Sequence, residues 1–173
     1  MGAVMSSLRA IGFLDVSTFT ARFITTYRER LKDDANYPGA QTIMLRSASS
    51  DAAILKEWKS GRAVLQHLRN AAAPFLGGKP AVLGKCMVVS LKPGSHTDWQ
   101  RSDDEYTQEH FRLHIGMVPS PLAMVYSGGE GLNIMVGQVV AVDQQQLHSE
   151  INIGSVARVN LVCDVRRPAI QED

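Results

Sequence analysis

The sequence has little of what marks several large classes of protein. It contains only two cysteines in 173 residues, too few for a disulfide framework or for a cysteine-based zinc site. Its formal net charge of +1 provides no basic excess for nucleic acid or for an anionic membrane surface. No apolar run approaches the roughly 20 residues that a membrane-spanning helix requires. We therefore expect neither a nucleic acid nor a membrane as a partner.

The cellular compartment is also inferred from an absence. The first residues, MGAVMSSLRAIGFLDVS, lack the basic segment and long apolar segment of a signal peptide. Cys86 and Cys163 both lie in apolar, strand-like runs, and buried reduced thiols are typical of a cytoplasmic protein. We therefore expect a cytoplasmic protein.

What the sequence does contain indicates a globular protein. Apolar residues make up 45% of the chain and charged residues 20%, which is ordinary for a globular protein. The length suits one hydrophobic core, so we predict a single domain over residues 1–173. Within it, residues 1–78 read as a mostly helical support region, and the pattern changes after Gly77 and Gly78.

The N-terminal region shows helical periodicity. Residues 17–34 carry apolar side chains at spacings of four, with Ser17 as a plausible N-cap, which predicts an amphipathic helix. Residues 41–47 read as a short strand, and residues 50–72 read as helical, with Gly61 as a possible break.

The C-terminal part reads as a succession of short strands. The candidates span residues 81–92, 111–118, 122–127, 132–136, 138–143, 146–152 and 156–165, and Pro, Gly and Asn residues separate them. Short strands without intervening helices indicate an antiparallel sandwich or barrel. We therefore expect a mainly β fold with N-terminal helices packed on it.

The segment GSHTDWQ places a histidine and an aspartate one residue apart. In an extended segment residues i and i+2 project from the same face, so His96 and Asp98 could bind one ion together. The alternative is that both lie in a solvated surface loop.

A second histidine stands near an arginine in the segment LHSEINIGSVARVNLVCDV. The segment reads as a β-hairpin, and a turn centred on Ile153 pairs His148 directly with Arg158. A buried arginine requires an anionic partner. That partner is either a protein carboxylate, from Asp164, Glu150 or Asp143, or the carboxylate of a bound ligand.

These residues suit one known kind of metal centre. Two histidines and one carboxylate form the facial triad of non-haem Fe(II) oxygenases, which leaves three coordination positions open. A 2-oxo acid can occupy two of these positions and O₂ the third. The distal carboxylate of 2-oxoglutarate then requires a cation, and Arg158 beside His148 suits that role.

Four further segments, LKPGSHTDW, RLHIGMV, VGQVVAVDQQQLHSEIN and ARVNLVCDVRRP, occur in order over residues 86–168. Together they resemble the aspartyl/asparaginyl β-hydroxylase-like family of Fe(II)/2-oxoglutarate-dependent oxygenases. The chain looks more like the bacterial members that keep His-x-Asp, including proline cis-4-hydroxylase-like enzymes. The resemblance implies a double-stranded β-helix (a jelly-roll, cupin-like core) as the catalytic part, over residues 79–168.

The resemblance also implies roles for individual residues. His96, Asp98 and His148 would bind Fe(II), and Arg158 and His114 would bind the cosubstrate 2-oxoglutarate. Arg112 would contact cosubstrate or substrate. A histidine such as His114, taken alone, is more often a satisfied core group than a ligand.

Arg46 is a candidate clamp for a substrate carboxylate, or else a solvent-facing strand arginine.

The chain departs from the family pattern in two places. The turn at Pro93 and Gly94 runs almost directly into His96, where the family usually has more residues, and residues 99–110 form an inserted loop. This loop carries Asp103, Asp104 and Glu105, and is either a lid over the site or solvated surface.

The resulting hypothesis is a 2-oxoglutarate-dependent dioxygenase with Fe(II) and O₂. It would hydroxylate an unactivated C–H bond of an amino acid, or of an Asp/Asn-type residue in a peptide, with succinate and CO₂ as coproducts. One alternative is a non-oxygenase, cupin-like metal protein, either an isomerase or a small-ligand sensor. Another is a β-sandwich interaction module. Arg158 favours the first, because neither alternative requires a cation there.

Overall fold

A computed structural model describes residues 7–26, 28–35, 37–46, 66–70, 72–73 and 81–167. Antiparallel strands dominate them, so the expected mainly β class is confirmed. The strands are β1 (Leu8–Phe13), β2 (Lys32–Asp34), β3 (Tyr37–Arg46), β4 (Leu83–Leu91), β5 (Ser95–His96), β6 (His110–Val118), β7 (Ala123–Ser127), β8 (Glu130–Leu132), β9 (Gln138–Val142), β10 (His148–Asn152) and β11 (Arg158–Arg166). The helices are α1 (Ser17–Thr26), the 3₁₀ helix η1 (Arg28–Arg30) and α3 (Glu105–Glu109).

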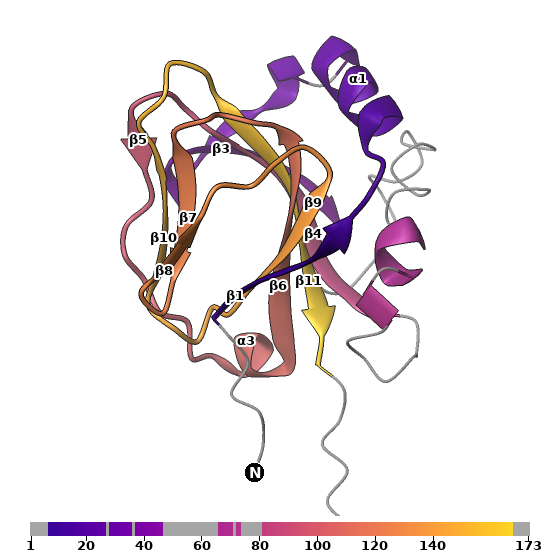
Figure 1. The fold of residues 1–173 in the computed structure, drawn as a ribbon, viewed down its shortest axis with the longest axis vertical. Coiled ribbons are helices and arrows are strands. Elements are labelled where there is room, and N and C mark those ends of the chain that lie inside the picture. The colour runs from indigo at the N-terminus through magenta and orange to yellow at the C-terminus, as the bar shows by residue number, and fades with distance from the viewer. Residues whose placement is uncertain are drawn as a thin grey trace, which may run out of the picture.

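The strands form two sheets that face each other (Figure 1). The larger sheet has seven strands in the order β1-β9-β6-β11-β4-β3-β2, and the smaller has four in the order β5-β10-β7-β8. From β4 onward the chain passes back and forth between the sheets, as when β10 is followed by β11, apart from the hairpin of β7 and β8 within the smaller sheet. This alternation is the winding of the expected jelly roll.

The central strands of the larger sheet are buried along almost their whole length. Every residue of β11 except Arg166 is buried, and so is every residue of β6 except Val118. The reason is that both faces of this sheet are covered. Helix α1 lies against its outer face (Figure 1), and Phe19 and Phe23 join that core. The inner face, opposite the smaller sheet, is the one from which side chains reach the pocket described below.

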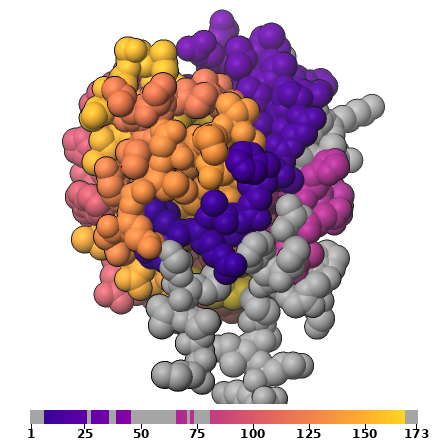
Figure 2. Space-filling view, viewed as in Figure 1, coloured from indigo at the N-terminus to yellow at the C-terminus, as the bar shows by residue number. Residues whose placement is uncertain are grey.

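The N-terminal region contributes strands as well as helix. The expectation that residues 1–78 are mostly helical is wrong in the described part, because β1, β2 and β3 belong to the larger sheet. The helix expected over residues 17–34 ends at Thr26, and Lys32–Asp34 pair with β3 instead of continuing it. Figure 2 shows this N-terminal segment, in indigo, packed directly against later strands, in orange.

Residues 50–65, which include most of the second expected helix, lie outside the described residues, whereas residues 66–70 are helical as expected. Among the described residues, no helix is long and apolar enough to cross a membrane. Cys86 and Cys163 are buried free thiols that face each other on β4 and β11, as the strand-like runs predicted.

The expected hairpin between residues 148 and 158 is not formed. Strand β10 pairs with β5 and β7, whereas β11 pairs with β4 and β6. The turn after Asn152 therefore carries the chain from one sheet to the other. His148 and Arg158 are consequently not cross-strand neighbours, and they belong to opposite sheets.

Candidate active site

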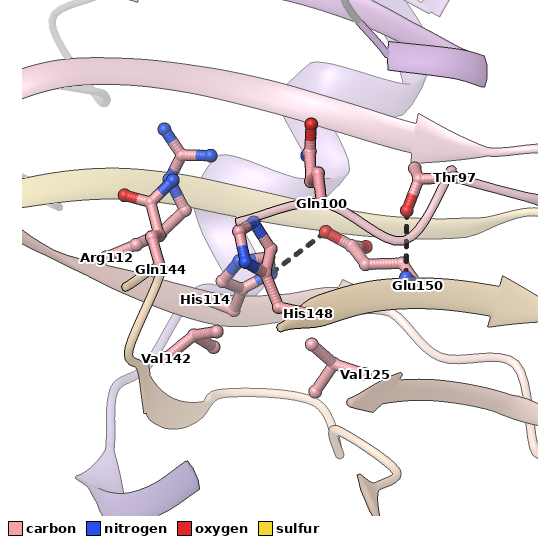
Figure 3. A pocket seen from close by; sticks show the side chains of 9 residues that line it. All are labelled: Thr97, Gln100, Arg112, His114, Val125, Val142, Gln144, His148 and Glu150. Atoms are coloured by element: carbon pink, nitrogen blue, oxygen red, sulfur yellow. Dashed lines mark hydrogen bonds and ion pairs between the residues drawn. The ribbon is translucent and has the colours of Figure 1, made fainter. Parts of the chain in front are cut away.

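A small pocket lies between the two sheets, and side chains from both sheets point into it (Figure 3). Its enclosed volume is about 10 Å³, enough for about one water molecule. The lining residues are Thr97, Gln100, Arg112, His114, Val125, Val142, Gln144, His148 and Glu150. Most of these side chains are polar although the site is largely buried, so they require hydrogen-bond or ionic partners.

His148 enters the pocket from the first position of β10 and is 8% exposed. Its Nδ1 lies 2.9 Å from the carbonyl oxygen of Gln146, which accepts the Nδ1 proton and leaves Nε2 with a lone pair. Nε2 is buried and has no hydrogen-bond partner among the described residues. Burial lowers the pKa of His148, although the bond to Gln146 opposes this shift. His148 is thus a neutral imidazole that presents a free acceptor nitrogen.

Gln100 lies directly opposite His148. The Gln100 N–H donates to the carbonyl oxygen of His148 at 3.0 Å, and the His148 N–H donates to that of Gln100 at 2.9 Å. The Thr97 N–H donates to the Glu150 carbonyl oxygen at 2.8 Å, so Thr97 lies opposite Glu150 in the same way. Residues 97–100 must then contain one more residue than the facing stretch of β10, which is a bulge. The extra residue places Gln100, instead of Trp99, opposite His148, and Thr97 keeps the regular register that already points it into the pocket.

His96 and Asp98 lie outside this pocket, and both are exposed. Within the described residues, no three His, Cys, Asp or Glu side chains are close enough together to hold a metal ion. The expectation that His96, Asp98 and His148 converge on one ion is therefore wrong in this structure. The two residues do share exposure, as alternation requires, but Thr97 between them takes the inward position.

Arg158 is buried, at 1% exposed, at the first position of β11. Its Nη2 forms an ion pair with Oε2 of Glu150, which comes from the opposite sheet. Glu150 is thus the anionic partner, one of the three protein carboxylates that the sequence offered. Burial lowers the pKa of Arg158 to about 10, so the guanidinium remains charged near neutral pH. Its Nε and Nη1 have no hydrogen-bond partner among the described residues.

His114 lies beside this ion pair on β6. Its Nδ1 is 3.5 Å from Asn160 Nδ2 and 3.7 Å from Glu150 Oε1. Burial lowers the pKa of His114 well below its usual value, and the charges of Arg158 and Arg112 lower it further. His114 is therefore neutral at pH 7. The predicted roles of His114 and Arg158 as cosubstrate ligands remain predictions; His114 lines the pocket, and Arg158 adjoins it through Glu150.

Arg112 reaches the pocket but is held by a carboxylate. Its Nε and Nη2 donate to the two oxygens of Asp164 at 2.7 and 3.1 Å, and Asp164 is fully buried. This bidentate pair fixes the guanidinium plane. The predicted contact with substrate or cosubstrate remains a prediction.

The side chain of Arg46 lies outside the described part of the structure, so its predicted clamp is also untested. Its main chain ends β3 and pairs with Cys86.

The loop over residues 99–110 contains a short helix and is anchored at its start. The Ser102 N–H donates to the carbonyl oxygen of Gln144 at 3.0 Å. Asp104 caps helix α3 by accepting the Thr107 N–H at 2.8 Å, so this carboxylate serves the helix. Tyr106 accepts the Lys85 N–H at 2.7 Å.

Sequence reasoning did not identify Thr97, Gln100 or Gln144 as pocket residues. None belongs to a residue type that signals a site on its own, and the bulge that places Gln100 opposite His148 leaves no pattern in the sequence.

Comparisons with known proteins agree with this architecture. The sequence matches the family described as aspartyl/asparaginyl beta-hydroxylase over residues 45–168. Among curated proteins, no sequence matches significantly. Similar solved structures include a Pseudomonas putida prolyl-4-hydroxylase, with 17% identity, a TM-score of 0.59, and 94% of this chain and 92% of that chain covered. AviO1 from Streptomyces viridochromogenes has 17% identity, a TM-score of 0.63 and coverages of 94% and 90%.

A viral collagen prolyl hydroxylase from Paramecium bursaria Chlorella virus-1, solved as a 2OG complex, has 14% identity and a TM-score of 0.58. The alignment covers 94% of this chain and 97% of that chain. At these identities the likeness concerns the fold, and it confirms the expected jelly-roll class.

Proposed function

Because the chain belongs to the aspartyl/asparaginyl β-hydroxylase family, we propose that its pocket binds a small carboxylate-bearing molecule as part of a 2-oxoglutarate-dependent hydroxylation. Family membership supports this class of enzyme, with Fe(II), 2-oxoglutarate and O₂ as its cofactors. The substrate that we propose is an amino acid, or an Asp/Asn-type residue in a peptide. Hydroxylation of its C–H bond would be coupled to the conversion of 2-oxoglutarate into succinate and CO₂.

One observation carries the proposal: Arg158 is a fully buried guanidinium paired with Glu150, which lines a pocket that also holds a free imidazole nitrogen. Arg158 would bind a carboxylate of the ligand, since two of its nitrogens have no partner among the described residues. Neutral His114 would donate or accept one hydrogen bond beside it. Val125 and Val142 would exclude water from the reacting carbon.

The residues of the pocket fit the family's cofactors only in part. The end with Arg158 and His114 fits a 2-oxo acid, and His148 fits as one metal ligand because its Nε2 is buried and unpartnered. The iron ligand set is incomplete, because Gln100 stands opposite His148 and the residues that the structure describes hold no three-donor cluster. We therefore assign no step of the reaction to iron bound by His96 and Asp98.

This incomplete set favours a second candidate, a non-oxygenase, cupin-like protein that binds a small carboxylate-bearing ligand without turning it over. The support for this candidate is Gln100, because the residue paired with His148 in the pocket carries an amide, which is a weak metal ligand. Both candidates use the same anion-binding end of the pocket and differ in metal binding and turnover.

One experiment separates them. The purified protein is titrated anaerobically with Fe(II) in the presence of 2-oxoglutarate, and the charge-transfer absorption of the iron–2-oxoglutarate complex is recorded. In air, succinate release is then measured with a panel of amino acids and peptides. The hydroxylase is expected to show both signals, with release stimulated by its substrate. Ligand binding that depends on Arg158, without either signal, would establish the second candidate and reject the first.

A further inference from the structure

We propose that Glu150 determines which ligands this pocket accepts, because it is a built-in carboxylate that competes with a ligand carboxylate for the Arg158 guanidinium. The inference rests on the proposed function in that it concerns the same anion-binding end of the pocket. It adds a residue that controls specificity and that belongs to neither the predicted metal set nor the predicted cosubstrate set.

The contacts of Arg158 lead to this assignment. Among the described residues, Glu150 is the carboxylate that forms an ion pair with Arg158, and it does so from the opposite sheet. The same carboxylate lies 3.7 Å from His114 through Oε1. One side chain thus engages both residues that were predicted to bind the cosubstrate. An incoming carboxylate has to displace Glu150 or share the guanidinium with it.

The main chain of Glu150 is fixed, whereas its side chain ends in the pocket. Its N–H donates to Thr97 Oγ1 at 2.9 Å, and its carbonyl oxygen accepts the Thr97 N–H at 2.8 Å. On the other side it is paired with Val125 of β7. The backbone therefore cannot withdraw without breaking two strand pairings. A rotation of the side chain about its own bonds is the movement that would uncover Arg158.

Charge and space both oppose an anionic ligand in the present arrangement. Arg158 and Glu150 carry opposite charges, and neutral His114 adds none, so this end of the pocket has no net positive charge. The pocket volume of about 10 Å³ leaves room for about one water molecule beside the Glu150 side chain. Removing the Glu150 charge would leave a buried guanidinium without a counter-ion, which a ligand carboxylate would then supply.

The test measures binding of two dicarboxylates, 2-oxoglutarate and glutarate, by isothermal titration calorimetry. The variants are wild type, Glu150→Gln and Asp103→Asn, the last being a matched loss of one exposed carboxylate. We expect Glu150→Gln to bind both ligands at least about tenfold more tightly than wild type, and Asp103→Asn to bind them as wild type does. Affinities for Glu150→Gln within about twofold of wild type would overturn the proposal.

Two additions keep the test decisive. Arg158→Gln in the Glu150→Gln background should abolish the gain, since the gain requires the freed guanidinium. If Glu150→Gln does not fold, Glu150→Asp draws the carboxylate back by one methylene and should show a smaller gain in the same direction.

Glutarate lacks the keto group and cannot be turned over, so its binding tests Glu150 alone. A gain for glutarate without succinate release from 2-oxoglutarate would leave this inference standing while the hydroxylase fails. Turnover by wild type without any gain in Glu150→Gln would support the hydroxylase and overturn the inference about Glu150.

Discussion

Gln100 presents an amide to His148 where a metal site would need an imidazole or a carboxylate. The main chains of the two residues are bonded to each other in both directions, so their separation is fixed by strand pairing. An amide oxygen is a weak ligand for the metals that imidazole suits. The site therefore lacks a second strong metal ligand because of the identity of the side chain at position 100. The strand pairing that holds this position beside His148 is intact.

This argument predicts a gain of function. Gln100→His combined with Ser102→Asp places a second imidazole and a carboxylate on the segment that faces His148. We expect Co(II) to bind at least about tenfold more tightly than to wild type, a difference of about 1.4 kcal/mol, measured by the visible absorption of bound Co(II). Arg101→His adds the same imidazole at an exposed position and should change nothing. An equal gain in both variants would contradict the predicted geometry.

A second prediction concerns the buried pair of Arg112 and Asp164. Asp164→Asn removes the counter-charge of a guanidinium that is 8% exposed, so we expect a loss of about 3–5 kcal/mol in the free energy of unfolding. Urea denaturation measures it. The control, Asp33→Asn, breaks the exposed pair with Lys92 and should cost far less. A small loss for Asp164→Asn would mean that Arg112 has another anion nearby.

At this scale the sequence predicted some site residues and not others. Arg158, His114 and His148 were recognised because a charged or imidazole side chain within an apolar strand needs a buried partner or a ligand. His96 and Asp98 were assigned to the wrong face. Alternation shows that two residues share a face but does not show which face it is. Glu150 was recognised only as one of three possible partners.

Among the elements, helix α1 supports the sheet that forms one wall of the pocket. Phe19 and Phe23 of α1 are almost fully buried against the larger sheet, whereas Ile24 beside them is 44% exposed. The helix therefore covers the outer face of the strands whose inner face bears His114 and Arg158.

Shortening a buried side chain of α1 should show how much the packing of this helix contributes to stability. Phe23→Ala is expected to lower the free energy of unfolding by about 3–5 kcal/mol, because it leaves a cavity against the sheet. The adjacent Ile24→Ala should change it by less than about 0.5 kcal/mol. Thermal and urea unfolding of the two variants provide the measurement, and similar losses in both would contradict the packing described for α1.

The elements themselves were largely predictable. Six strand candidates correspond to β4, β6, β7, β9, β10 and β11 with shifted ends, because alternating apolar residues and Gly or Pro turns mark them. The candidate over residues 132–136 meets β8 only at Leu132. Strand β1 was not predicted, since six half-exposed residues carry no clear alternation. The false hairpin arose because a short turn between strands usually joins neighbours in one sheet. In this jelly roll the turn between β10 and β11 joins strands of opposite sheets. Tertiary packing, and not the sequence of the turn, determines which sheet each strand enters.

At the scale of the whole molecule, the buried histidines make stability depend on pH. Burial lowers the folded-state pKa of His114 and of His148, so below about pH 6.5 the unfolded chain binds protons that the folded chain does not. Stability is therefore complete above that pH and declines as the pH falls through it.

We expect the free energy of unfolding to fall between pH 7.5 and 5.5, by at most about 1.4 kcal/mol per pH unit for each histidine. Urea denaturation at several pH values measures the slope. His114→Gln should reduce the slope and leave the part that His148 contributes, whereas His96→Gln, which changes an exposed histidine, should leave it unchanged. A slope in His114→Gln equal to that of wild type would show that His114 does not contribute.

The pairing of β1 with β9 has a consequence for how the protein forms during synthesis. Leu8 lies in register opposite Val142, so β1 has no strand partner until β9 has been synthesised. β9 must also dock beside β6, and β6 beside β11, so the larger sheet closes only after β11 has been made. Such long-range pairing is typical of slow folding, and a waiting strand edge is a site where chaperones or other nascent chains can bind.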